Sequence, residues 1–133
     1  MNLQHEEILC KNFMLIIDMY RSRLVDPEKF KIIHIANEQP RTTGKEKIAN
    51  ILRGKKQKAM GKLGGVWDYM GMYFDREYNC ERFFFLEAKY GKNKLSQKQK
   101  EFKIFLDICN VKNGVFYSPD EAIQYFLDWN IIK

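Results

Sequence analysis

The sequence predicts one α/β domain over residues 1–133, with a central mixed sheet flanked by helices. Three observations lead to this prediction. Helical stripes, with apolar residues three and four positions apart, alternate along the chain with short runs rich in β-branched and aromatic residues. Two capping boxes, which begin at Ser96 and Ser118, mark helix starts in the C-terminal half. The length suits one domain and leaves little chain for a second.

The N-terminal part predicts a helix followed by a strand. Helical spacing over about residues 5–22 is carried by Leu9, Phe13, Ile16, Ile17 and Tyr20. This helix should stop before Asp26-Pro27, because a proline disfavours helix in the residue before it. Residues 30–36 are short and rich in β-branched side chains, which is typical of a strand. A basic segment follows, and Ile48, Ile51 and Leu52 within it predict one short helix.

Two further strands are predicted over residues 66–74 and 82–89, joined by a polar turn. The second is apolar through its middle, so we expect it to be covered on both faces, with its phenylalanines in the core. The antiparallel geometry of a hairpin brings the start of one strand beside the end of the other. Asp68 should therefore lie near Glu87 and Lys89.

The C-terminal part predicts helix, strand, helix. The Ser96-to-Gln99 capping box precedes an apolar stripe that begins at Phe102. Residues 114–117 form a short strand, and Pro119 suits the first position of the last helix. The expected order is helix, strand, short helix, strand, strand, helix, strand, helix.

Composition excludes several classes of protein. The chain is 45% hydrophobic, 30% charged and 14% aromatic, which a disordered chain would not be. The longest apolar runs, such as 83–86, are too short to cross a bilayer, and residues 1–7 do not read as a secretory signal. The three cysteines show no C-x-x-C spacing, which argues against zinc and against a disulfide framework. We expect a cytoplasmic protein without a membrane partner.

The net charge of +6 comes largely from two segments, residues 41–62 and 89–103, which hold fourteen of the 23 basic residues. Clustered cations suggest a polyanion partner, although a solvated lysine surface explains such runs equally well. If the partner is DNA, the candidate contacts are Lys45, Lys55, Lys56, Lys58, Lys62, Lys92 and Lys94. Gly64 and Gly65 would let a DNA backbone come close.

One constellation could carry chemistry, namely Asp68 with Glu87 and Lys89 on the partner strand. Two carboxylates form a hard oxygen site suited to Mg²⁺, for which Mn²⁺ would substitute, and the Ala88 carbonyl could join them. A lysine beside the ion can orient or deprotonate a water and neutralise charge on a phosphate. The alternative is that these are ordinary charged strand ends.

Several sequence segments, taken in order, resemble the VRR-NUC domain, a branch of the PD-(D/E)XK nuclease superfamily. The resemblance covers about residues 5–128, and it rests on Glu6 and on residues 34–38, 58–68, 86–89, 95–102 and 115–122. It implies a restriction-endonuclease-like αβββαβ core and a metal-dependent nuclease site. Two departures are Trp67 and Gln97, which stand where the family usually has proline.

The resemblance also implies roles for individual residues. Asp68 and Glu87 would be metal ligands, Lys89 the catalytic lysine, Gln99 a catalytic glutamine and Glu6 an acid near the metal. Alternatives remain open for two of them. Gln99 could simply close its capping box, and Glu6 could be ordinary helix charge, with Glu7 as a substitute acid. In the segment 34–38, a core or hydrogen-bonded His34 is favoured over a ligand. Asn37 and Glu38 could form a turn or contact DNA, and the turn is favoured.

The expected function is a Mg²⁺-dependent DNA endonuclease that acts without a covalent intermediate. Short, stand-alone members of the family look like resolvases of branched or four-way junction DNA, which implies a homodimer because a junction needs two symmetric cuts. Two alternatives are a DNA-binding module that does not cut and a nuclease for linear duplex or single-stranded DNA.

Overall fold

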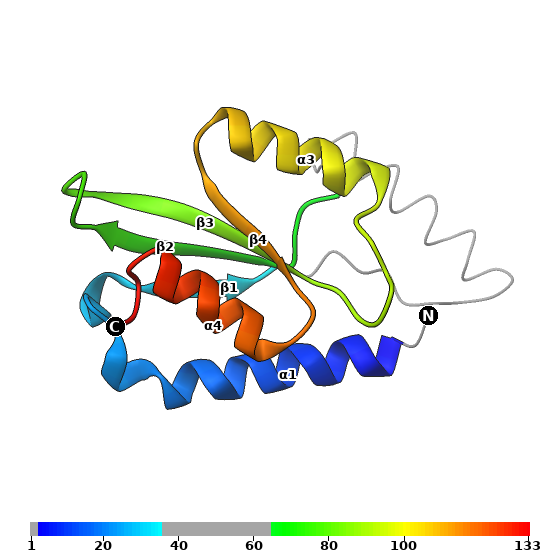
Figure 1. Cartoon of the computed structure of the whole chain (residues 1–133), viewed down its shortest axis with the longest axis horizontal. Helices are drawn as coiled ribbons and strands as arrows, with labels where there is room; N and C mark the ends of the chain where they lie inside the picture. Colours follow the sequence, from blue (N-terminus) through cyan, green and yellow to red (C-terminus); the bar gives the residue numbers. More distant parts are fainter. Residues whose placement is uncertain (1–2, 36–64) are drawn as a thin grey trace, which may run out of the picture.

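The computed structural model describes residues 3–35 and 65–133, and its architecture is α/β (Figure 1). The elements follow the expected order, and the short helix expected around residues 48–52 lies outside the described residues. The helices and strands are α1 (Leu3–Met19), β1 (Lys31–His34), β2 (Tyr69–Asp75), β3 (Cys80–Ala88), α3 (Gln97–Ile108), β4 (Lys112–Phe116) and α4 (Pro119–Asp128). The first helix thus ends earlier than expected, and Asp68 and Lys89 lie just outside their strands.

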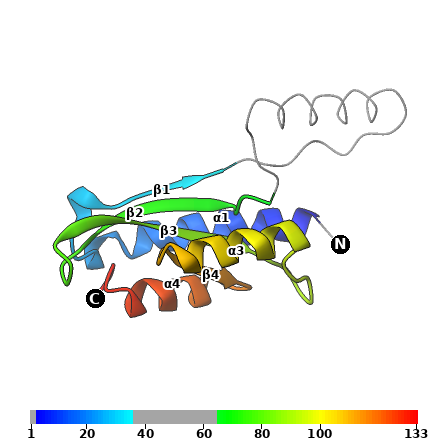
Figure 2. The same ribbon diagram turned by 90° about the horizontal axis from the view of Figure 1, so that it is seen from above.

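The four strands form one mixed sheet in the order β1-β2-β3-β4. The first three are antiparallel neighbours, and β4 runs parallel to β3. Helices α1 and α4 lie against one face of the sheet, and α3 lies against the other (Figures 1 and 2). The predicted mixed sheet flanked by helices is therefore confirmed.

The face towards α1 and α4 forms the closed core. Phe13 of α1 is fully buried there, and its ring centroid lies 4.9 Å from that of Tyr69 and 4.7 Å from that of Phe116. Phe84 and Phe126 complete the aromatic centre of the cluster. The helical stripe of α1 explains this packing, because its buried positions fall on one side of the helix.

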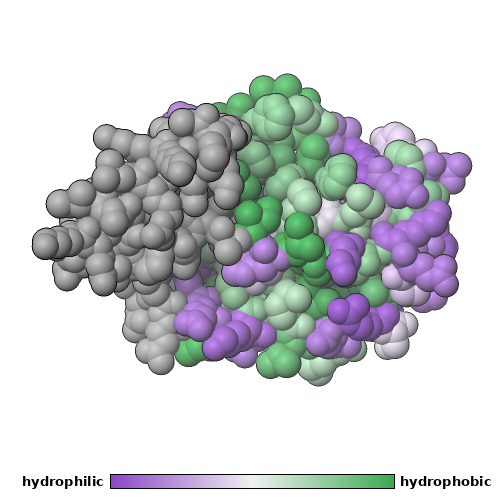
Figure 3. Space-filling model, turned by 180° about the vertical axis from the view of Figure 1, so that it is seen from behind, coloured by the Kyte–Doolittle hydropathy of each residue, from purple (hydrophilic) through white to green (hydrophobic). Residues whose placement is uncertain are grey.

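The face towards α3 is only partly covered. Phe85 packs against Phe102 of α3, whereas Phe83 is exposed. Exposed apolar side chains also include Ile33, Met72 and Phe105, and Figure 3 shows apolar surface running down from the top of the molecule. The expectation that β3 is covered on both faces was wrong at Phe83, because an apolar run looks the same whether or not a helix packs on it.

Within the described residues, no helix has the length and apolar character needed to cross a membrane.

Replacement of Phe13 by alanine should lower the free energy of unfolding by roughly 3–5 kcal/mol, because the ring leaves a cavity in a closed core. Leu15→Ala on the same helix is the matched control, since Leu15 is exposed. Urea unfolding of both variants measures the difference. Equal effects would contradict the assignment of this helix face.

Candidate active site

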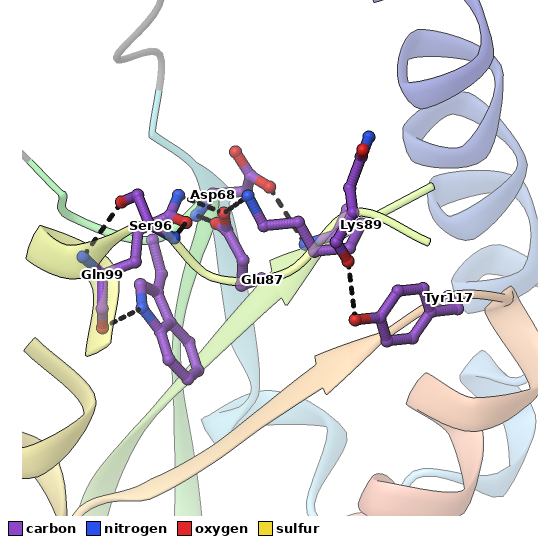
Figure 4. A network of polar contacts seen from close by, with 9 residues as sticks. Asp68, Glu87, Lys89, Ser96, Gln99 and Tyr117 are labelled. Atoms are coloured by element: carbon purple, nitrogen blue, oxygen red, sulfur yellow. Dashed lines mark hydrogen bonds and ion pairs between the residues drawn. The ribbon is translucent and has the colours of Figure 1, made fainter. Parts of the chain in front are cut away.

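Asp68 and Glu87 lie side by side where β2 begins and β3 ends. The register pairs Tyr69 with Leu86, which sets Asp68 opposite Glu87. The backbone N–H of Asp68 donates to Glu87 Oε1 at 2.9 Å, and the backbone N–H of Ala88 donates to Asp68 Oδ2 at 3.0 Å (Figure 4). Each carboxylate is thus held by the backbone of the opposite strand. The predicted proximity of the two acids is confirmed.

Lys89 completes the expected trio. Its ammonium nitrogen lies 3.5 Å from Glu87 Oε2, and its side chain is largely buried. Its backbone N–H donates to the Phe116 carbonyl at 3.0 Å, so the parallel pairing with β4 continues one residue past the end of β3. The lysine is therefore positioned by the sheet as well as by its ion pair.

Gln99 of α3 reaches the same carboxylate. Its side-chain Nε2 donates to Glu87 Oε2 at 2.6 Å. Its Oε1 accepts from the Ser96 backbone N–H at 2.9 Å, while its own N–H donates to Ser96 Oγ, which closes the capping box. The two interpretations of Gln99 are therefore compatible, because the capping bond occupies the amide oxygen and leaves the NH₂ group directed at Glu87.

Trp67 links the segment before Asp68 to the first turn of α3. Its ring is fully buried, and its Nε1–H donates to the Gln99 backbone carbonyl at 3.2 Å. Sequence reasoning treated Trp67 as core and missed this contact. The only sequence signal for this hydrogen bond is that Trp67 stands at a position where the family usually has proline, and that tryptophan carries a ring N–H donor.

Gly65 was expected to give DNA close access to the backbone, but the structure shows close access for α3. Gly65 has a φ of +81°, and a β-carbon built there would lie 2.6 Å from Lys98 Cβ. The missing side chain therefore lets the start of α3 approach this segment. A DNA contact at Gly65 stays a prediction.

Glu87 is the one charged side chain that is buried among the described residues, at 2% exposure. Burial and the neighbouring Asp68 carboxylate raise the pKa of Glu87 to about 8, whereas the Asp68 backbone N–H and Lys89 act in the opposite direction. Burial beside a second acid therefore favours the protonated form of Glu87 more than in an exposed glutamate. A divalent cation can replace this proton, since metal binding favours the ionised ligand.

The residues present fit a magnesium ion. Mg²⁺ is bound in proteins by one or two carboxylates and keeps several waters, and Asp68 and Glu87 supply that number. Within residues 3–35 and 65–133, no group of three His, Cys, Asp or Glu side chains could hold a metal, so Glu6 does not form such a group with the two acids. The Ala88 carbonyl as a further ligand stays a prediction.

The remaining candidates lie in several places. Glu6 is half-buried in the first turn of α1, and its proposed role stays a prediction. Glu7 is exposed and pairs with Lys11. His34, expected to be buried or hydrogen-bonded, is instead exposed, with its ring 4.9 Å from that of Tyr69.

Among the candidate DNA contacts, Lys92 and Lys94 are exposed in the loop between β3 and α3. Lys103, in the same basic segment, bonds to Asn113 at 2.7 Å and to Asp107 at 3.3 Å, so it has a structural role. The candidates outside the described residues are Lys45, Lys55, Lys56, Lys58, Lys62 and Gly64, with Asn37 and Glu38.

Comparison of the chain with protein-family models, with curated proteins and with solved structures finds no match.

The raised pKa of Glu87 predicts how stability depends on pH. Without divalent cations, the folded chain keeps the Glu87 proton up to about pH 8, while the unfolded chain loses it near 4.5. Between these values the folded state binds more protons, so the free energy of unfolding should fall by a few kcal/mol as pH rises. Glu87→Gln removes the titrating group and should flatten this slope. Denaturant titrations across the interval measure both proteins, and identical slopes would contradict the assignment.

Proposed function

We propose that this chain is a metal-dependent DNA endonuclease of the PD-(D/E)XK type, in the VRR-NUC branch. The observation that carries the proposal is the convergence of Asp68, Glu87 and Lys89 at adjacent strand ends, held by reciprocal hydrogen bonds. The αβββαβ order and the mixed sheet support it, because the resemblance implies the same restriction-endonuclease-like core.

The chemistry is hydrolysis of a phosphodiester by water, with no covalent intermediate. Asp68 and Glu87 would hold Mg²⁺ or Mn²⁺, which supplies Lewis-acid stabilisation of the phosphate and a more acidic water when bound. Lys89 orients or deprotonates the attacking water and neutralises charge that develops on the phosphate. Gln99 keeps the Glu87 carboxylate in place through its Nε2.

The proposed substrate is branched DNA, such as a four-way junction, which a C₂ homodimer would cut symmetrically. Exposed Lys92 and Lys94 lie in the loop that follows Lys89, where they can contact phosphates flanking the cut. The alternative functions predict different results in DNA binding and cleavage assays. A DNA-binding module would bind without cutting in any divalent cation, and a nuclease for linear DNA would cut duplex or single strands as fast as junctions.

Asp68→Ala and Lys89→Ala should each lower the single-turnover rate of junction cleavage in Mg²⁺ by about 100-fold or more, because each removes a group that acts on the phosphate. The matched controls are Glu81→Gln and Lys29→Met, because Glu81 of β3 and Lys29, in the turn before β1, form an exposed ion pair away from the site. These controls should cleave normally. Undiminished cleavage by both alanine variants would contradict the assignment of Asp68 and Lys89 to the active site.

A junction nuclease should be dimeric when it binds its substrate. Light scattering should give the mass of two chains for the free protein, and the mass of two chains plus one junction for the complex in EDTA, because two symmetric cuts need two sites. A monomer under both conditions would contradict the junction as substrate while leaving the hydrolytic site untested by that result.

A further inference from the structure

Two partly exposed tyrosines flank Lys89. Tyr90 follows it directly and is 40% exposed, and Tyr117 is 39% exposed. The Lys89 backbone N–H donates to the Phe116 carbonyl, so Tyr117 follows directly on the neighbouring strand. Figure 4 shows Tyr117 at the end of β4 and the Lys89 side chain directed towards Glu87. The two tyrosines thus lie at the end of the sheet where Lys89 reaches Glu87, with the Tyr90 ring on the α1 side.

Each ring is held by a contact at its edge rather than by burial. The Tyr117 hydroxyl donates to the Asn93 carbonyl at 2.8 Å, which ties the ring to the loop after β3. The Tyr90 ring meets the His5 ring of α1 edge to face, with centroids 4.5 Å apart and planes at 88°. Fixed rings lose little conformational freedom on binding, so their exposed surface is ready for a planar partner.

The loop after β3 is the basic side of this surface, whereas Glu121 on the far side accepts the Tyr117 backbone N–H at 3.2 Å. Lys92 and Lys94 are exposed on the same loop as Tyr90, and Asn93 between them holds Tyr117. Aromatic rings set among cations are typical of surfaces that bind single strands, because the bases stack on the rings while the phosphates contact the cations.

We infer that Tyr90 and Tyr117 stack on unpaired nucleobases beside the phosphate that faces Lys89. In a continuous duplex both faces of each base are already stacked, so the rings can engage only bases that a branch, flap or single strand leaves free. The inference rests on the proposed function for the position of the phosphate. It makes unpaired nucleotides at the cut position the feature that this site recognises.

The test compares binding of a flap, whose single strand supplies unpaired bases, with binding of a fully paired duplex, in EDTA so that no DNA is cut. Tyr90→Leu and Tyr117→Leu keep apolar bulk but lose the ring, and each should weaken binding to the branched DNA by about tenfold while leaving duplex binding unchanged. Tyr90→Phe keeps the ring and should bind within about twofold of the wild type, whereas Tyr117→Phe keeps the ring but loses the bond to Asn93 and should fall between the wild type and Tyr117→Leu. Tyr78→Leu is the matched control, because Tyr78 is 62% exposed in the turn between β2 and β3.

A second readout places the bases. The fluorescent base 2-aminopurine, set in the unpaired nucleotides next to the cut, should be quenched by the wild type and by the phenylalanine variants but not by the leucine variants. Loss of quenching in the leucine variants supports the inference whether or not the chain cuts DNA in Mg²⁺. Absence of cleavage in Mg²⁺ would overturn the proposed function but not the inference. Cleavage in Mg²⁺ with equal binding of branched and paired DNA by all variants would overturn the inference and leave the nuclease intact.

Discussion

The buried carboxylate of Glu87 is the constraint on which the rest of the site depends. A carboxylate at 2% exposure is costly unless it is paired and hydrogen-bonded. Its donors come from three parts of the chain, namely the Asp68 backbone, the Gln99 amide and the Lys89 ammonium. Burial of one group therefore ties together the start of β2, the first turn of α3 and the residue after β3. The same arrangement brings two acids and a lysine together at one end of the sheet.

Helix capping and site geometry are coupled through Gln99. The amide oxygen satisfies an N–H at the helix start, which a capping box does in many helices, and the remaining NH₂ group points at Glu87. Trp67 and Gly65 hold this first turn of α3 close to the segment that leads into Asp68. The residues that would hold the metal and the residues that start α3 are thus parts of one hydrogen-bonded unit, so a change in one is transmitted to the other.

The closed core of the protein and the loop beside the site differ in character. The face under α1 and α4 is a closed aromatic core, which holds the strand ends in register. The loop after β3, by contrast, presents exposed lysines and partly exposed tyrosines around Lys89. A rigid scaffold beside an accessible basic and aromatic rim allows the carboxylates to remain positioned while a polyanion approaches.

The sequence by itself determined the local features. Periodicity and the capping residues Ser96 and Ser118 predicted the helices, and hairpin geometry alone set Asp68 opposite Glu87, because these depend on neighbours along one or two strands. Only the tertiary structure decided where α3 lies. That placement brings Gln99 to Glu87, gives Trp67 its hydrogen bond and leaves Phe83 exposed. The packing of α3 against the sheet depends on the fit of whole surfaces, which no local pattern of residues encodes.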